Sequence, residues 1–286
     1  MGVNTKYKDS MFSLLFSDPD ILRELYAALE GVTLSADVPV TINTLQDVLF
    51  MDRVNDISFE IAGTLIILIE HQATINPNMA LRLLMYIARV YEKIIGDKNI
   101  YATKRITIPR PEFFVLYNGA AAYPDETTLK LSDTFESGCA LGLGGKGTPA
   151  LELEVKVINI NMGRNDRIVK RCETLAGYSA FVGKVVEYQR EKEDREAAIK
   201  KAIKYCVDHD ILKDFLVQNS SEVINMLMTE WNWDDALAVR FEEGLEEGRE
   251  EGLEEVARNA LAQGIPIDVI KTITGLNVET IKNLSS

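Results

Sequence analysis

The spacing of hydrophobic residues changes along the chain from a helical period to a strand period and back. Apolar side chains recur at helical spacing over residues 11–29, with an interruption at residues 17–19. Asp18 followed by Pro19 is a combination typical of a helix start, and Gly31 is a residue that typically ends one. We therefore predict a helical segment that is broken, begins again after Asp18 and ends at Gly31.

A strand period follows in residues 55–72. Residues 55–61 alternate polar and apolar side chains, as in a half-buried strand. Residues 65–69 are wholly apolar, as in a fully buried strand, and Gly63 lies in the short turn between the two runs. These features predict an antiparallel hairpin in which Ile61 pairs with Leu65.

Helices and strands then alternate. An amphipathic helix is predicted over residues 78–95, and strands are predicted over residues 113–117 and 151–160, with a loop between them. The chain is predicted to be helical over residues 168–233, with a break at residues 208–210. This order predicts a mixed α/β domain, in which helices flank a sheet.

The C-terminal part carries a short repeat. Glu-Glu-Gly recurs every four residues in residues 242–255, which places the glycines on one helix face. Such a stripe would allow close packing against a second helix, and a solvated connector is the alternative. Residues 273–281 resemble a helix-turn-helix, but Lys282 is the sole cation near its second helix, so a small packing module is the alternative to DNA reading.

Composition narrows the class of protein. With 286 residues, the chain can bury a sizeable core. No apolar run approaches the roughly 20 residues of a membrane helix, and the first ten residues do not look like a signal peptide. The odd, widely spaced cysteines (Cys139, Cys172 and Cys206) favour a reducing cytoplasm, and a zinc site is not expected.

The formal net charge of −13 argues against nucleic acid, but the charge is uneven. Eight glutamates and one arginine in residues 242–255 contribute −7, which leaves −6 for the rest of the chain. A local basic face can still meet a phosphate backbone. Two basic clusters could form one: Lys98, Lys104, Arg105 and Arg110, then Arg164, Arg167, Lys170 and Arg171.

The hairpin register has a chemical consequence. If Ile61 pairs with Leu65, Asp56 lies opposite Glu70, with Cβ atoms about 4.5–5.5 Å apart. Gln72 shares the face of Glu70 because side chains alternate along a strand. Paired carboxylates repel unless a cation lies between them, and oxygen ligands suit Mg²⁺ or Mn²⁺. A solvated sheet end is the alternative, and a one-residue slip would separate the two acids.

Several sequence blocks carry a family resemblance: residues 55–59, 68–72, 74–82 and 114–119, with the C-terminal Glu-Glu-Gly repeats. Together they resemble the PD-(D/E)XK nuclease family transposases, also called the Rpn or recombination-promoting nuclease family. The resemblance extends over nearly the whole chain. It implies a restriction-endonuclease-like fold, a metal-dependent DNA endonuclease activity, a bacterial source and a link with recombination or mobile elements.

The resemblance also implies roles for residues of the hairpin. Asp56 and Glu70 would hold Mg²⁺ or Mn²⁺ together with the backbone carbonyl of His71, and Gln72 would orient the attacking water. Gln72 stands where the family usually has lysine, and an amide lacks the positive charge of that side chain. The alternative is a degenerate nuclease fold that binds DNA or a protein partner without cutting.

Other residues are weaker candidates. Arg82 could contact a phosphate or form a salt bridge, and Glu60 could be an outer acid of the site or simply exposed. Asp9 could lie near the site or cap a helix. We expect the His71 side chain on the opposite sheet face, and His209 on the surface or at a helix end.

The predicted domains are a PD-(D/E)XK nuclease-like domain over residues 1–185, a helical extension over residues 186–240, and a Glu/Gly-repeat helix with a small helical tail over residues 241–286. DNA is the expected partner, and no membrane is expected. A homodimer through the C-terminal helical region would place two sites on two DNA strands.

Overall fold

The computed structural model describes residues 11–43, 57–96, 100–101, 103–136, 149–191, 194–277 and 280–281, with backbone alone for residues 229–248 and 250–251. The chain divides into two compact units, residues 1–230 and residues 231–286. Each unit is described by itself. In the described part of the chain, no helix is both long enough and apolar enough to cross a membrane.

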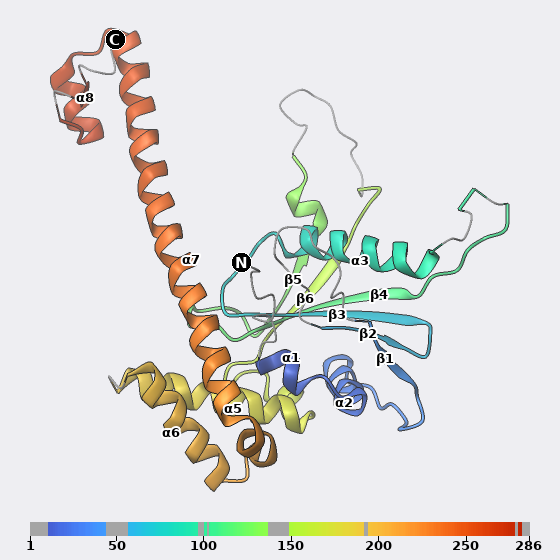
Figure 1. Cartoon of the computed structure of the whole chain (residues 1–286). Coiled ribbons are helices and arrows are strands. Elements are labelled where there is room, and N and C mark those ends of the chain that lie inside the picture. The colour runs from blue at the N-terminus through green and yellow to red at the C-terminus, as the bar shows by residue number, and fades with distance from the viewer. Residues whose placement is uncertain are drawn as a thin grey trace, which may run out of the picture. The chain divides into compact units, whose positions relative to one another are not determined.

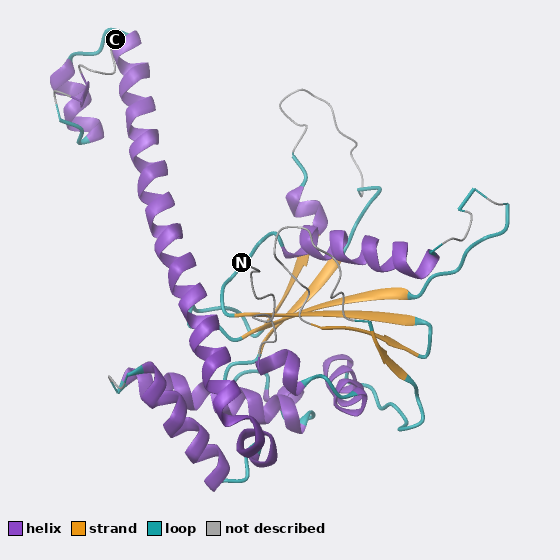
Figure 2. Cartoon of the chain, viewed as in Figure 1, coloured by secondary structure: helices purple, strands orange, loops and turns teal. Residues whose placement is uncertain are grey.

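A six-stranded mixed sheet forms the centre of the first unit (Figures 1 and 2). Its strand order is β1-β2-β3-β4-β6-β5. The first three strands of this order are antiparallel, the central β3, β4 and β6 are parallel, and β5 runs antiparallel to β6. The strands are β1 (Val40–Ile42), β2 (Ile57–Ile61), β3 (Leu65–Gln72), β4 (Arg110–Tyr117), β5 (Glu126–Lys130) and β6 (Glu154–Asn159).

The β2–β3 hairpin has the predicted register. Ile61 pairs with Leu65, and the pairing continues to Ile57 opposite Ile69. Ala62 and Gly63, in the turn, both have positive φ values of 52° and 66°. Such a turn follows the right-handed twist of the two strands. The predicted pairing is therefore confirmed as far as Ile57, and Asp56 lies outside the described residues.

One face of the sheet is covered by α3 (Met79–Ile95), which ends at Gly96 as predicted (Figure 1). The helix buries an apolar stripe because its sequence repeats apolar residues at helical spacing. The stripe packs against the β3, β4 and β6 side chains that point to this face. These strand residues are Ile66, Leu68, Phe113, Val115, Tyr117, Val155 and Val157.

The other face lies against α1 (Met11–Leu15), α2 (Pro19–Glu30) and α5 (Glu173–Arg190) (Figure 1). The side chain of Asp18 accepts a hydrogen bond from the Asp20 N–H at 2.7 Å and so caps α2. Gly31 ends α2 with a φ of 68°. The predicted helix start and stop are both confirmed. The Tyr26 hydroxyl donates to Glu112 on β4 at 2.9 Å and ties α2 to this face.

Two edge strands were not predicted. β1 has three residues, and β5 occupies part of the segment that was expected to be a loop. The sequence of β5 is Glu-Thr-Thr-Leu-Lys, and its side chains alternate between exposed and half-buried positions. Such a strand buries little apolar surface, so pairing with its neighbour determines its conformation more than hydrophobic periodicity does.

Helices make up the rest of the first unit. After α4 (Asp166–Val169), α5 is followed by α6 (Arg195–Asp208) and α7 (Lys213–Ala262). The predicted break near residues 208–210 is confirmed, because α6 ends at Asp208 and α7 begins at Lys213. A further break between α5 and α6 was not predicted.

The second unit contains the end of α7 and α8 (Ile267–Thr274). Gly264 and Gly275 adopt the left-handed conformation that ends a helix, with φ values of 75° and 73°. The Asn277 side chain accepts a hydrogen bond from the Thr280 N–H at 2.8 Å, as an N-cap residue does. Four buried residues form a small core: Ala257, Ala260, Ile270 and Ile281.

The mixed sheet, its flanking helices and the helical extension confirm the predicted fold class.

Candidate active site at the carboxyl edge of the sheet

The parallel strands β3, β4 and β6 end at the same edge of the sheet. β3 ends at Gln72, and its last residues pair with Val115 and Tyr117 of β4. β6 ends at Asn159, which pairs with Tyr117. In open α/β sheets, ligands bind in the crevice outside the carboxyl ends of such strands. Glu70, His71 and Gln72 therefore lie at the edge where chemistry is expected.

Glu70 is a buried acid at this edge. The residue is only 3% exposed, and its side chain shares the α3 face with Leu68. The Arg82 guanidinium on α3 donates from Nη2 to Glu70 Oε2 at 2.9 Å. A buried carboxylate needs a partner of this kind, since removal of a charge from water is costly. Of the two roles considered for Arg82, the structure shows the salt bridge.

Gln72 and Arg82 meet at the sulfur of Met79. The Gln72 amide donates to Met79 Sδ at 2.9 Å, and Arg82 Nη1 lies 3.3 Å from the same sulfur. Arg82 also donates to the Tyr86 hydroxyl at 3.3 Å, and its guanidinium lies 5.9 Å from the centre of the Tyr86 ring. The structure thus brings Glu70, Gln72 and Arg82 together around the first turns of α3.

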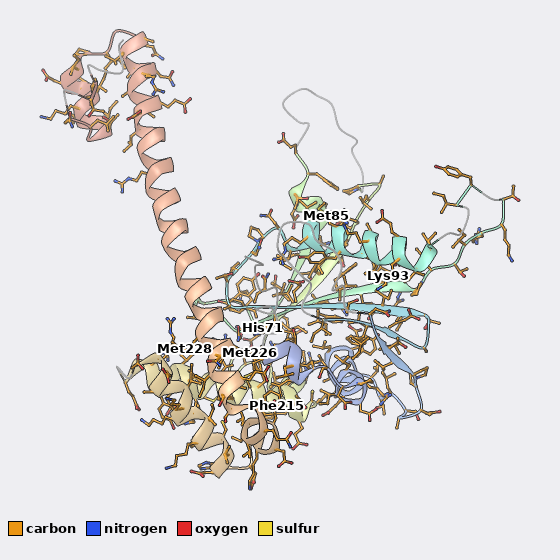
Figure 3. The ribbon with its side chains drawn as sticks, viewed as in Figure 1. His71, Met85, Lys93, Phe215, Met226 and Met228 are labelled. Atoms are coloured by element: carbon orange, nitrogen blue, oxygen red, sulfur yellow. The ribbon has the colours of Figure 1, made fainter. Side chains whose placement is uncertain are left out.

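The His71 side chain points to the opposite face, as predicted (Figure 3). Its Nε2 lies 2.9 Å from the Tyr178 hydroxyl on α5, and its ring stacks on Phe12 with centroids 4.8 Å apart. Burial lowers the pKa of His71 from 6.5 to about 4, so the imidazole is neutral at pH 7. This side chain belongs to the packing between the sheet and α5.

The direction of the His71 backbone carbonyl follows from the hydrogen bonds of β3. The Asn118 N–H donates to the Gln72 carbonyl at 3.0 Å, so that carbonyl faces β4. Carbonyl groups alternate along a strand, and the His71 carbonyl therefore faces the side of β3 on which β2 lies.

Glu60 and Ser58 share the face of Glu70. Glu60 accepts a hydrogen bond from Asn43 Nδ2 at 3.4 Å and pairs with Ile66, four residues from Glu70. At about 3.3 Å per residue it lies roughly 13 Å away along the strand, so it is not brought to the carboxyl edge. Ser58 is fully buried, and its hydroxyl has no hydrogen-bond partner in the described residues.

A group of asparagines at this edge was not found from the sequence. Asn159 is 3% exposed, donates to the Tyr123 carbonyl at 3.2 Å and accepts from the Asn161 N–H at 3.1 Å. Asn161 Nδ2 donates to the Gly119 carbonyl at 3.0 Å. These bonds hold together the segments that leave β4 and β6. The sequence signal for this group is an asparagine directly after the end of β4, Asn118, and another at the end of β6, Asn159.

The oxygen atoms at this edge are of the types that bind a hard divalent cation. They are the Glu70 carboxylate, the Gln72 amide oxygen and the His71 carbonyl, and Mg²⁺ prefers such donors. Asp56 and Asp9 lie outside the described residues. Among the residues that are described, no group of three or more His, Cys, Asp or Glu side chains could hold a metal ion.

Two cavities lie near the sheet. A cavity of about 10 Å³, enough for one water molecule, is lined by Gln72, Met79 and Tyr117 among others. A cavity of about 570 Å³ lies at the amino ends of β4 and β6, beside Arg110 and Glu154. The larger cavity is at the opposite end of the strands, so size alone does not mark the candidate site.

The basic cluster at residues 164–171 is largely neutralised. Three of its cations form ion pairs: Arg164 with Asp125 at 2.9 Å, Arg167 with Glu126 at 3.1 Å, and Lys170 with Asp166 at 2.6 Å. Such pairs weaken the attraction that the cluster would exert on a phosphate backbone.

The remaining sequence candidates have structural roles. His209 follows α6, its Nδ1 lies 2.7 Å from the Tyr205 carbonyl, and it is exposed, which confirms a capping position on the surface. Cys172 and Cys206 are buried, and burial raises their thiol pKa values to about 12 and about 11. Neither is therefore a reactive thiolate at pH 7. Cys139 lies outside the described residues.

The mixed six-stranded sheet with helices on both faces is consistent with a restriction-endonuclease-like fold. Residues 43–154 match the family described as "Putative transposase, YhgA-like", a PD-(D/E)XK nuclease-like family. This match confirms the family resemblance, over a narrower segment than the sequence blocks had suggested. Comparisons with curated proteins and with solved structures give no match.

Proposed function

We propose that this protein is a metal-dependent DNA endonuclease that hydrolyses phosphodiester bonds and is associated with recombination or mobile elements. The observation that carries the proposal is the position of Glu70 and Gln72. Both lie on one face at the carboxyl end of β3, next to a hairpin in the register that the motif requires. The match to a transposase family with nuclease-like members supports the same chemistry.

In this proposal Asp56, Glu70 and the His71 carbonyl hold Mg²⁺ or Mn²⁺. When bound, the metal would polarise the phosphodiester and lower the pKa of a water molecule. Gln72 would orient the attacking water, since its amide oxygen can accept a hydrogen bond while its NH₂ group stays on Met79. DNA would be the substrate. A cytoplasmic, bacterial protein that dimerises through its C-terminal helical region stays a prediction.

A second candidate is a nuclease fold that binds DNA or a protein partner without cutting. The salt bridge between Glu70 and Arg82 favours it, because a carboxylate already neutralised by a guanidinium is a weaker metal ligand. Gln72 in the lysine position points the same way, since the site then lacks a cation at that position.

Nicking of supercoiled plasmid distinguishes the two candidates. The purified chain is incubated with Mg²⁺, Mn²⁺ or EDTA, beside Asp56→Ala and Glu70→Gln. Glu60→Gln is the matched control, because Glu60 is an acid on the same sheet face away from the edge. We expect metal-dependent nicking that falls at least about 100-fold in the first two variants and is unchanged in the control.

Two results would contradict the endonuclease. Nicking that survives both Asp56→Ala and Glu70→Gln would show that the activity arises elsewhere. No nicking with either metal, by protein that circular dichroism shows to be folded, would favour the second candidate.

A further inference from the structure

Arg82 forms a salt bridge with the Glu70 carboxylate, which is a ligand of the proposed metal. We propose that Arg82 couples metal binding to DNA binding: it pairs with Glu70 in the free protein and transfers to a DNA phosphate when DNA binds, which releases Glu70 for the metal. This inference rests on the proposed function, because it assigns the regulation of the same site.

The geometry of the ion pair carries the argument. Arg82 Nη2 is 2.9 Å from Glu70 Oε2, and the Glu70 side chain is 4% exposed. The Arg82 side chain is 21% exposed, so it reaches from the buried acid toward solvent. A side chain in this position can contact both an interior carboxylate and a ligand that approaches from outside.

Arg82 also contacts neutral groups beside the ion pair. Met79 offers a thioether and Tyr86 a hydroxyl and a ring face, and each of these is a weak partner for a cation. A phosphate can compete with such groups for the guanidinium, which binds phosphate through a planar pair of N–H groups.

A metal ion at Glu70 and Arg82 at Glu70 oppose each other. Both are cations directed at one carboxylate, and two positive charges a few ångströms apart repel. A DNA phosphate that draws Arg82 away should therefore raise the affinity for the metal. Thermodynamic linkage requires the reciprocal effect, so a bound metal should raise the affinity for DNA.

The test measures two binding affinities and needs no cleavage. Mn²⁺ binding to the full chain without DNA is followed by the electron paramagnetic resonance of free Mn²⁺. Binding of a fluorescent 20-base-pair duplex is followed by anisotropy in EDTA. The variants are Arg82→Gln and Arg82→Lys. Arg89→Gln is the control, because it changes an arginine two turns away on the same helix.

The expected changes have opposite signs. Arg82→Gln should bind Mn²⁺ about 10-fold more tightly than the unmodified chain, within the 5–150-fold range of typical couplings. It should bind DNA more weakly, with a salt slope reduced by about one. Arg82→Lys, which keeps the charge, should recover most of the DNA affinity, and Arg89→Gln should change neither measurement.

A purely structural salt bridge gives a different pattern. It predicts that Arg82→Gln binds Mn²⁺ equally well or more weakly, because the site is disturbed, and this result would overturn the inference while the endonuclease stands. Absence of Mn²⁺ binding in the unmodified chain and in every variant would overturn both. If Arg82→Gln fails to fold, Arg82→Lys serves as the test variant. Lysine lacks the planar guanidinium that pairs with Glu70, so a smaller increase in Mn²⁺ affinity is still expected.

Discussion

The half-buried His71 should make the first unit sensitive to mild acid. Burial lowers the pKa of His71 from 6.5 to about 4, so the unfolded chain binds a proton at a higher pH than the folded chain does. Between these two pH values His71 is protonated in the unfolded state and neutral in the native state. The free energy of unfolding must therefore fall as the pH falls through this window.

The size of the effect follows from the shift. A change of about 2.5 pKa units corresponds to about 3.4 kcal/mol once the pH lies below both values. Between pH 7.5 and pH 5 the expected loss is about 2 kcal/mol. Both figures are upper limits, because the His71 side chain keeps part of its surface in contact with solvent.

The assay is urea denaturation at several pH values, followed by near-ultraviolet circular dichroism. This signal reports the packing of buried aromatic rings such as Phe12 and Tyr178, which lie against His71. The control is His71→Gln, which can keep a hydrogen bond to the Tyr178 hydroxyl but does not titrate. Because the carboxylates and His209 are common to both proteins, the difference between the two pH profiles isolates His71.

The refuting result is a pair of parallel profiles. If the unmodified chain and His71→Gln lose the same stability between pH 7.5 and pH 5, His71 does not carry a lowered pKa in the native state. Its hydrogen bond to Tyr178 would then have to be compatible with a charged imidazole.

Two further predictions concern packing around the site. Leu83→Ala should lower the free energy of unfolding by about 2–5 kcal/mol in urea denaturation, because Leu83 is fully buried between α3 and the sheet. The equally conservative Leu81→Ala, at a position 42% exposed on the same helix, should cost far less, and equal losses would contradict the packing described here. Gly119→Ala should be destabilising by about 1–3 kcal/mol or more, since its Cβ would lie 1.8 Å from the Ala73 carbonyl oxygen. Gly252→Ala meets no atom within 4 Å in α7 and should not lower the melting temperature.

The hairpin could be predicted because its information is local. The alternation of residues 57–61, the apolar run from Leu65 and Gly63 in the turn all point to one register. Once the register is known, Glu70 and Gln72 must share a face. The edge strand β5 could not be predicted in this way, because it has a single apolar residue, Leu129, and forms by pairing with β6.

The contacts of the candidate site depend on tertiary packing. His71 and Tyr178 are 107 residues apart, and nothing in the sequence near either residue indicates their hydrogen bond. Figure 3 shows Met85 on α3, a residue 57% exposed, whereas Leu83 on the same helix is fully buried. The rotation of α3 is thus set by its apolar stripe. Arg82, next to Leu83, reaches Glu70 because of that rotation.

Positions 72 and 82 are best understood together. A lysine at position 72 would bring a second cation to the Met79 sulfur, which Arg82 already contacts at 3.3 Å. An ammonium group and a guanidinium group that contact the same sulfur atom would repel each other. A neutral amide avoids this repulsion and still donates to the sulfur. Gln72 is therefore consistent with a site whose positive charge has its place on α3.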